Sequence, residues 1–269
     1  MATLYVVATP IGNLEDITLR AIRTLREVSL IAAEDTRTAR KLLNHYEITA
    51  RVVSYNEHNM RTRTPELLSA LDSGNIALVS EAGTPGISDP GFELITSAIA
   101  AGHEVSPVPG PAAPIAALTA SGLPFREFTF IAFLPRKSSE RRRLFASLAA
   151  SPYTTVAFES PHRVQATFAD LLAALGDRRI AVCREMTKLF EEVFRGTISE
   201  AISHFKEPRG EFTLVIEGQT GTGEKLTDDD LRSRLQDLRA AGVSARDAAA
   251  QVARETGTPK RRVYALTHD

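Results

Sequence analysis

The first half of the chain alternates short apolar runs with longer segments in which apolar residues recur every three or four positions. The short runs have the length and β-branched character of buried strands, and the longer segments have the periodicity of amphipathic helices. Because strands that alternate with helices pair in parallel, the pattern predicts a five-strand parallel α/β domain over residues 1–120. The expected strands are LYVVA, SLIAAED, VVSY, IALVS and HEVSPV, and the expected helices are a segment from about Asp16, TARKLLNHY, PELLSALDSG and FELITSAIAAG, which ends at Gly102.

A second alternation of the same kind begins after Gly122 and Pro124, which interrupt the pattern. Its strands follow one another more closely, which favours a mixed sheet, and we expect a second α/β domain over residues 121–220. The expected strands are TFIAF, TTVAFE, RRIAVCREM and GEFTLVIEG, and the expected helices are ERRRLFASLAA and HRVQATFADLLAALG.

Residues 224–269 have the pattern of two or three short helices, which predicts a small C-terminal module. A short helix, a turn at Gly257 and a basic helix follow one another as in a helix-turn-helix. We expect the module to pack on the rest of the protein and to offer phosphate contacts rather than to read a DNA sequence. The residues expected to fill its core are Ala248, Val252, Val263 and Leu266.

The segment GQTGTGEK, which follows the last predicted strand, resembles a phosphate-binding P-loop. Glu224 separates the second glycine from Lys225, and Leu226 stands where a hydroxyl would bind magnesium. An acidic side chain would face the phosphates, so the segment is interpreted as an interdomain linker.

Composition limits the partners and the compartment. The 32 basic and 33 acidic residues give a net charge of −1, so a polyanion would have to bind to local basic patches. Cys183 is the only cysteine, which excludes an internal disulfide and a cysteine-based zinc cluster and fits a reducing compartment. The chain shows neither a basic leader nor an apolar run near the roughly 18 residues that span a bilayer. We therefore expect a cytoplasmic protein without membrane contact.

Four loops rich in glycine and proline each follow a predicted strand. In an open α/β sheet, loops beyond the carboxyl ends of the strands line the ligand crevice, and glycine lets the backbone approach a ligand closely. Recognition by main-chain groups suits S-adenosylmethionine and needs no metal. The loops are TPIGN, SEAGTPGISDPG, PVPGPAAP and FLPRK.

Seven motifs occur in the order of a known family: TPIGNLEDITLRA, AEDTR, SEAGTPGISDPG, VPGPAA, FLPRK, ESPHR and GEFTLVIEG. With them, residues 4–218 resemble the small-subunit ribosomal RNA (cytidine-2'-O-)-methyltransferases, relatives of the tetrapyrrole methylases. The resemblance implies a two-domain enzyme, usually a homodimer, that binds S-adenosylmethionine between its domains and methylates a cytidine ribose. Tetrapyrrole methylases proper carry G-x-G-P-G in the first loop. The segment Thr9–Asn13 departs from that pattern, which argues against a corrinoid substrate.

The resemblance also implies a set of cofactor-binding residues, all of which lie in the four loops. They are Pro10, Gly12 and Asn13 in the first loop; Glu81, Ala82, Gly83, Thr84, Pro85, Asp89, Pro90 and Gly91 in the second; Pro109, Gly110, Pro111 and Ala112 in the third; and Phe133 and Leu134 in the fourth.

Two basic clusters favour RNA as the methyl acceptor, because several cations close together can neutralise several phosphates. The first follows a cofactor loop and the second lies in the C-terminal module, and each could instead be a solvated helix face. The residues expected to bind RNA are Arg136, Lys137, Arg141, Arg142 and Arg143, together with Arg163 and with Lys260, Arg261 and Arg262.

The residue that accepts the proton of the ribose hydroxyl remains a shortlist of Asp35, Glu81 and His162, with Glu34, Glu185 and Lys188 as further candidates. Asp35 could equally cap the helix that begins at Thr36, and His162 could contact phosphate.

Two other functions remain open. One is a methylase of a tetrapyrrole or a protein side chain, which would leave the basic clusters without a task. The other is a metabolite-sensing regulator that binds nucleic acid, which would leave the FLPRK and ESPHR loops without a function. The expected partner is small-subunit ribosomal RNA, either free or in the assembled subunit.

Overall fold

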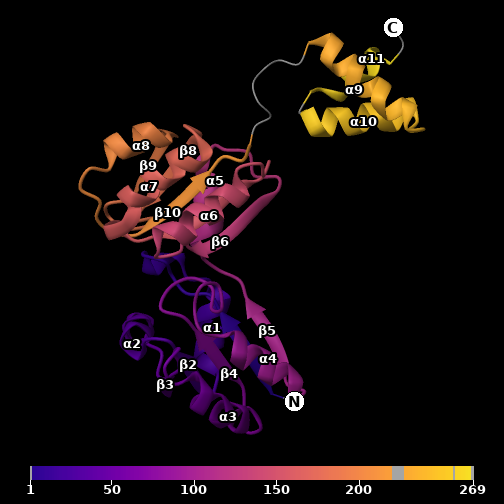
Figure 1. Cartoon of the computed structure of the whole chain (residues 1–269). Helices are drawn as coiled ribbons and strands as arrows, with labels where there is room; N and C mark the ends of the chain where they lie inside the picture. The colour runs from indigo at the N-terminus through magenta and orange to yellow at the C-terminus, as the bar shows by residue number, and fades with distance from the viewer. Residues whose placement is uncertain (1, 220–226, 257, 268–269) are drawn as a thin grey trace.

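The protein consists of two α/β domains followed by a helical module (Figure 1), as a computed structural model of the chain shows. The structure describes residues 2–219, 227–256 and 258–267, without the side chains of residues 254 and 255. The segment GQTGTGEK and the predicted turn at Gly257 therefore lie wholly or largely outside the described residues.

The first domain is built on a five-stranded sheet in the order β3-β2-β4-β1-β5, and every pair in it is parallel. The predicted five-strand parallel sheet is thus confirmed. Its strands are β1 (Thr3–Val7), β2 (Leu30–Ala33), β3 (Val52–Ser54), β4 (Ile76–Val79) and β5 (Glu104–Val108), and its helices are α1 (Leu19–Glu27), α2 (Thr36–His45), α3 (Met60–Leu71) and α4 (Phe92–Ala100).

Alternate strand residues face opposite layers of helices, which explains why the central strands β2 and β4 are apolar throughout. Ile31 of β2 packs with α1 and α2, whereas its neighbour Ala32 packs with α3 and α4. The helix expected from about Asp16 begins later, because Thr18 caps α1 and a short 3-10 turn, η1 (Leu14–Asp16), precedes it.

The second domain has a mixed sheet in the order β6-β7-β10-β8-β9, as the closer spacing of its strands predicted. Only β6 and β7 pair in parallel, and the other neighbours are antiparallel. Its strands are β6 (Phe128–Phe133), β7 (Thr154–Glu159), β8 (Arg179–Arg184), β9 (Glu192–Thr197) and β10 (Phe212–Ile216), and its helices are α5 (Ala113–Ser121), α6 (Ser138–Leu148), α7 (Pro161–Leu175) and α8 (Ile198–His204).

Two parts of the second domain differ from the expectation. Strand β9 and helices α5 and α8 were not predicted. Strand β9 is an edge strand with charged residues and a glycine and is only half-buried, so it lacks the pattern of a buried strand. Helix α5 falls within the range expected for the first domain, yet Ala117 and Leu118 pack against strands of the second sheet. By packing, the second domain therefore begins near residue 113 rather than 121.

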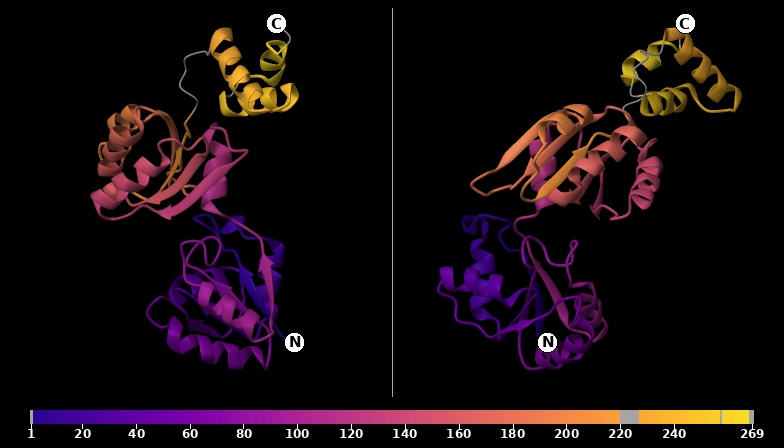
Figure 2. Two further views of the ribbon diagram at one scale, coloured as in Figure 1. Left: turned by 45° about the vertical axis from the view of Figure 1, so that its right-hand side comes forward. Right: turned by 60° about the vertical axis from the view of Figure 1, so that its left-hand side comes forward.

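The C-terminal module consists of α9 (Asp228–Ala240), α10 (Ala245–Thr256) and α11 (Lys260–Ala265). The four residues expected in its core do pack together, with Leu231 and Leu235 of α9. Figure 2 shows the module standing beyond the second domain rather than packed along it, in contrast to the expectation. Among the described residues, no helix is both long and apolar enough to cross a membrane.

Candidate active site

The predicted ligand crevice is present as a cleft between the two α/β domains, with a volume of about 600 Å³. Loops after β1, β2 and β4 form its first-domain side, and the start of α5 with the ends of β6, β7, β8 and β10 forms the other. The lining residues are Pro10, Ile11, Gly12, Leu14, Glu34, Thr38, Glu81, Ala82, Gly83, Thr84, Ile87, Ser88, Asp89, Ala112, Ala113, Pro114, Phe133, Phe158, Glu159, Ser160, Pro161, Cys183, Met186, Glu211, Phe212 and Thr213.

Main-chain hydrogen bonds hold the first two loops of the cleft together. The Thr9 N–H donates to the Gly83 carbonyl at 2.9 Å, and the Gly83 N–H donates back to the Thr9 carbonyl at 3.0 Å. Gly83 has a φ of +76°, which favours glycine. The loops are therefore fixed relative to one another before any ligand binds.

About half of the expected cofactor residues line the cleft, and the rest lie outside its lining. Asn13, for example, uses its side chain to accept the N–H of Glu15 at the start of η1. The residues in the lining are Pro10, Gly12, Glu81, Ala82, Gly83, Thr84, Asp89, Ala112 and Phe133, and those outside it are Asn13, Pro85, Pro90, Gly91, Pro109, Gly110, Pro111 and Leu134.

Three carboxylates gather on the first-domain side of the cleft, from residues 34, 81 and 89. Burial and the neighbouring Glu34 raise the pKa of Asp89 to about 7, against a hydrogen bond from Ser80 that lowers it. Burial also raises the pKa of Glu34, which accepts the Glu81 N–H at 3.1 Å. Asp89 is therefore a carboxylate that can gain and lose a proton near neutral pH.

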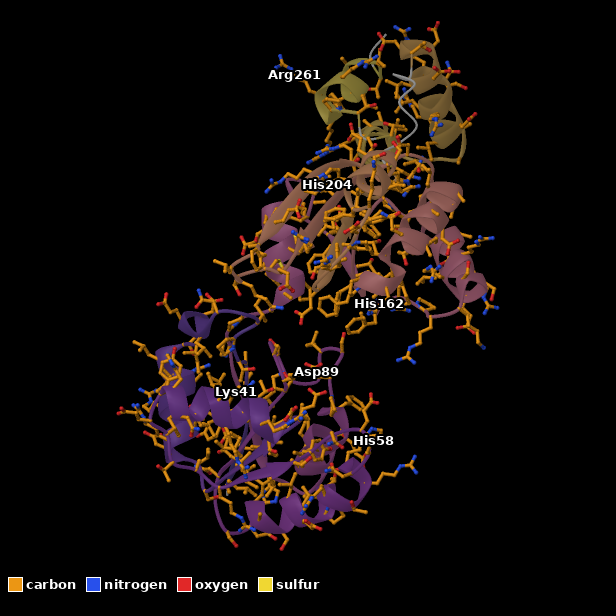
Figure 3. The ribbon with its side chains drawn as sticks, turned by 90° about the vertical axis from the view of Figure 1, so that its left-hand side faces the viewer. Lys41, His58, Asp89, His162, His204 and Arg261 are labelled. Carbon is orange, nitrogen blue, oxygen red and sulfur yellow. The ribbon has the colours of Figure 1, made fainter. Side chains whose placement is uncertain are left out.

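Asp89 was expected to bind the cofactor and not to act as a base, because its pKa depends on burial, which no sequence motif reveals. Figure 3 places it at the edge of the first domain that faces the second. His162 lies at the facing edge of the second domain, exposed at the start of α7 and outside the cleft lining.

Asp35 caps helix α2, which was the alternative to its role as a proton acceptor. Its side chain caps α2 by accepting the Arg37 N–H at 2.7 Å, and hydrogen bonds from Arg37 lower its pKa to about 2. Such a carboxylate is a weak base, so the structure removes Asp35 from the candidates.

Glu185 and Lys188 also have structural partners. The Lys188 amine lies 2.9 Å from Glu185 and 3.1 Å from Glu211, and its hydrogen bond lowers the pKa of Glu185. Both residues belong to the segment that joins β8 to β9 and that contacts the first loop at Gly12. Their role is to hold the second domain against the first loop.

Replacing Gly12 with alanine should weaken this contact between the domains. A Cβ there would lie 2.5 Å from Lys188 Cγ and 2.9 Å from the Met186 carbonyl oxygen, so the segment must move. We expect a loss of about 1–3 kcal/mol in unfolding free energy, the usual cost of overpacking, measured by denaturant titration. Gly102→Ala is a matched control for a glycine with open space around it, although its φ of +84° adds local strain. Equal stability of wild type and Gly12→Ala would contradict the contact.

The first basic cluster is divided by the fold. Arg141 is buried, with 3% of its surface exposed, and pairs with Asp170 on α7. The expectation that it binds RNA is therefore wrong, because α6 turns that side of the cluster inward. Arg163 is likewise engaged, pairing with Glu159 at 2.6 Å and donating to the Leu134 carbonyl at 3.1 Å.

The remaining basic residues are exposed. Lys137 lies 3.4 Å from Glu140, and Arg142 lies 2.6 Å from Asp170. In the module, Arg262 pairs with Asp228 at 2.7 Å, and Figure 3 shows Arg261 projecting from the surface. The exposed members of the two basic clusters are Arg136, Lys137, Arg142, Arg143, Lys260, Arg261 and Arg262. Within the described ranges, no group of three or more His, Cys, Asp or Glu side chains could hold a metal ion.

Comparison with known proteins gives matches over nearly the whole chain. Residues 3–202 match the family described as Tetrapyrrole (Corrin/Porphyrin) Methylases, and residues 226–269 match the RsmI C-terminal HTH domain. The chain is 48% identical to Ribosomal RNA small subunit methyltransferase I of Halalkalibacterium halodurans, over 99% of this chain and 94% of that protein. It is 49% identical to the protein of the same name from Synechocystis, over 99% and 98%.

A third relative and two solved structures are also similar to this chain. The protein of the same name from Thermotoga maritima is 51% identical and is covered completely by 81% of this chain. Among solved structures, diphthine synthase has a TM-score of 0.60 at 15% identity, covering 80% of this chain and 90% of that one. Uroporphyrin-III-C-methyltransferase from Thermus thermophilus has a TM-score of 0.56 at 20% identity, covering 80% and 94%.

Proposed function

The chain belongs to the tetrapyrrole methylase family, and we propose that it transfers the methyl group of S-adenosylmethionine to the ribose 2'-hydroxyl of a cytidine in small-subunit ribosomal RNA. The main support for this proposal is that the chain is 48–49% identical, over 99% of its length, to relatives named as small-subunit ribosomal RNA methyltransferases. The solved structures named for a porphyrin or for diphthine share only 15–20% identity, which supports the fold and not their substrates.

The cleft has the chemistry that S-adenosylmethionine requires. Its volume of about 600 Å³ falls in the range of small-molecule sites. The ligand carries a sulfonium and an ammonium, which the carboxylates of Glu34, Glu81 and Asp89 complement, and an adenine, which can pack on Phe133 and Phe158. Main-chain groups of residues 82–84 lie in the same wall.

The cofactor, when bound, supplies an activated methyl group on a good leaving group. The protein must then place the ribose hydroxyl in line with that methyl group, and positioning of this kind contributes much of a rate enhancement. The fixed pair of loops at Thr9 and Gly83 and the rigid sheet beneath them provide one wall of that site. The carboxylates provide acceptors for the proton that the hydroxyl must lose.

Asp89 is our proposed proton acceptor. It lines the cleft and its pKa of about 7 lets it be ionised at neutral pH yet still hold a proton, which suits a general base. Glu81 remains the second candidate because it lines the same wall, and His162 the third because it lies at the facing edge.

Exposed cations near the fourth loop are proposed to bind RNA phosphates. Arg136→Gln combined with Arg143→Gln should weaken binding of small-subunit RNA and reduce the slope of log K against log salt by about 1.4, or about 0.7 for each contact. The measurement is filter binding across a salt series. Arg23→Gln with Arg61→Gln removes two exposed arginines from α1 and α3 and should leave the slope unchanged. Equal slopes in both double variants would exclude this surface.

The activity itself can be tested with purified protein, labelled S-adenosylmethionine and small subunits from a strain that lacks the enzyme. We expect label on one cytidine, at the 2'-oxygen, as mapped by nuclease digestion and mass spectrometry. Label on a base or on a ribosomal protein would contradict the proposal. Naked ribosomal RNA in parallel reactions shows whether the assembled subunit is required.

We also infer a homodimer in the cytoplasm. The resemblance implies the dimer, and Leu189 and Phe190, which are 89% and 70% exposed in the segment between β8 and β9, supply apolar surface for it. The buried free thiol of Cys183 is compatible with a reducing compartment. Light scattering of the purified protein tests the oligomeric state.

A further inference from the structure

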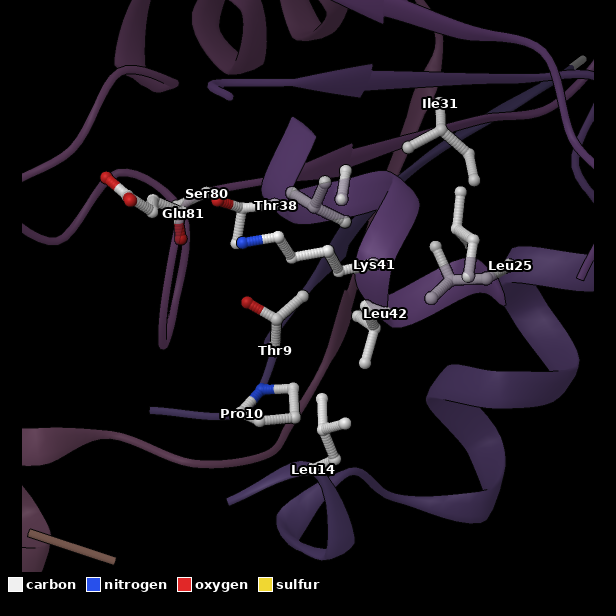
Figure 4. Close-up of a pocket in the computed structure, with 13 residues that line it drawn as sticks. Thr9, Pro10, Leu14, Leu25, Ile31, Thr38, Lys41, Leu42, Ser80 and Glu81 are labelled. Carbon is white, nitrogen blue, oxygen red and sulfur yellow. The ribbon is translucent and has the colours of Figure 1, made fainter. Parts of the chain in front are cut away.

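A second, smaller cavity lies in the first domain, between α2 and the loops after β1 and β4 (Figure 4). This side cavity has a volume of about 210 Å³ and is lined by Thr9, Pro10, Leu14, Leu25, Ile31, Thr38, Ala39, Lys41, Leu42, Leu43, Val79, Ser80 and Glu81. It adjoins the cleft, because both are lined by Pro10, Leu14, Thr38 and Glu81.

The walls of the side cavity are mostly apolar, with one buried hydroxyl that has no partner. Thr9 is 3% exposed, and in the described part of the chain its Oγ1 atom makes no hydrogen bond. Protein interiors are normally close-packed, and buried polar atoms normally find partners. The side cavity leaves space unfilled and leaves the Thr9 hydroxyl without a partner, and it adjoins the cleft. It is therefore suited to a ligand that fills the space and forms a hydrogen bond with Thr9.

Lys41 supplies a positive charge at the same place. Its side chain extends from α2 toward Ser80 in Figure 4 and lines the side cavity. Lys41 forms no salt bridge or hydrogen bond among the residues that the structure describes. Its ammonium is therefore available to a ligand acceptor.

We propose that the side cavity receives the base of the nucleotide whose ribose is methylated. An engineered apolar cavity of roughly 150 Å³ accommodates benzene, so 210 Å³ suits a single six-membered ring with its substituents. Drug-sized ligands and cofactors generally need about 300 Å³ or more. The apolar walls can contact the faces of the ring, as in other sites for unstacked bases.

The covalent structure of a nucleotide places the base close to a hydroxyl bound in the cleft, and the inference rests on the proposed function. The base and the 2'-hydroxyl are attached to neighbouring ribose carbons, so a hydroxyl placed in the cleft brings the base to an adjoining surface. Cytosine offers acceptors at O2 and N3 for the Lys41 ammonium and an amino group for the Thr9 hydroxyl. Both protein groups would then acquire the partners that they lack in the described structure.

The test pairs enzyme variants with two substrates: small subunits reconstituted from RNA with cytidine at the mapped target, and from RNA with an abasic ribose there. Lys41→Met and Thr9→Val should each raise KM for the cytidine substrate by about 10-fold or more, the usual effect of losing a buried or charged hydrogen bond. Neither should change KM for the abasic substrate. Ala39→Leu, which fills the side cavity, should show the same selectivity.

The matched control is Arg40→Met, which removes a positive charge from the same helix at an exposed position outside the cavity lining. It should behave as wild type with both substrates. Equal effects of Lys41→Met on both substrates would mean a phosphate contact and overturn the inference, as would weaker S-adenosylmethionine binding in calorimetry. Thermal unfolding identifies any variant that fails to fold. Because Lys41 is exposed, Lys41→Met should fold normally, so it still tests the inference if Thr9→Val or Ala39→Leu does not fold. Wild-type enzyme that methylates neither substrate would instead contradict the proposed function.

Discussion

Asp89→Asn is expected to lower kcat by about 100- to 10,000-fold, the usual contribution of a general base. Because the Asp89 pKa is about 7, wild-type kcat/KM should rise with pH below about 7 and level off above it. The variant should lose this dependence, since asparagine cannot accept the proton. Initial rates at saturating cofactor and over a range of small-subunit concentrations, measured from pH 5.5 to 9, give kcat and kcat/KM and check both expectations.

Stability separates a catalytic from a structural role for Asp89. A carboxyl whose folded pKa is raised above its unfolded value favours the protonated form, so ionisation destabilises the fold as pH rises from about 4 through about 7. Asp89→Asn should therefore melt at a higher temperature than wild type at pH 8, with a smaller difference at pH 5. Glu81→Gln is the matched control from the same wall. A larger loss of kcat in Glu81→Gln than in Asp89→Asn would transfer the role to Glu81.

Arg141→Met is expected to cost about 3–5 kcal/mol in unfolding free energy, the range for removing one partner of a buried ion pair. The side chains of Arg141 and Asp170 are each 4% exposed, so methionine leaves the carboxylate in the interior without its buried partner. Denaturant titration at pH 7 measures the loss. This cost is the reason that the variant would be a poor probe of RNA binding.

Arg142→Met is the control, because it removes a cation that bonds to the same carboxylate but is 67% exposed, and it should cost at most about 1 kcal/mol. Burial raises the pKa of Asp170, but hydrogen bonds from Arg142, Arg141 and Ser138 outweigh burial, so the pKa lies below its usual value. Their stabilisation is present above the unfolded pKa and is lost as pH falls through the folded pKa. The difference between Arg141→Met and wild type should thus shrink in acid, and a constant difference would mean lost packing alone.

Much of the fold could be predicted because a strand covered by helices on both faces of its sheet consists of consecutive apolar residues, which the sequence shows directly. The central strands β2 and β4 of the first sheet are apolar throughout, and Gly102 marks the end of α4, although the start of α1 at the Thr18 cap was missed. Strand β9 left no such trace, since a half-buried edge strand tolerates charged residues. Helix α5 was not predicted, and its residues fell within the range expected for the first domain because the sequence does not show on which sheet an apolar segment packs.

The candidate site was predictable only in part. Loops after parallel strands meet at one edge, so the sequence indicated the cleft and its loops, including Gly83 and Asp89. The sequence did not indicate which loop residues line the cleft and which, like Asn13 at the cap of η1, lie outside its lining. That distinction depends on the path of each loop in space.

The sequence by itself determined the strands and helices of the first sheet, the Gly/Pro loops and the family resemblance, because these depend on neighbouring residues and local spacing. The tertiary structure decided the roles of the charged residues. Arg141 and Arg143 are two positions apart, yet one is buried against Asp170 and the other is exposed. Asp35 and Asp89 are both loop aspartates, yet Arg37 lowers the pKa of one to about 2 and burial raises the other to about 7. Charge energetics depend on burial and on partners far apart in the chain, which only packing brings together.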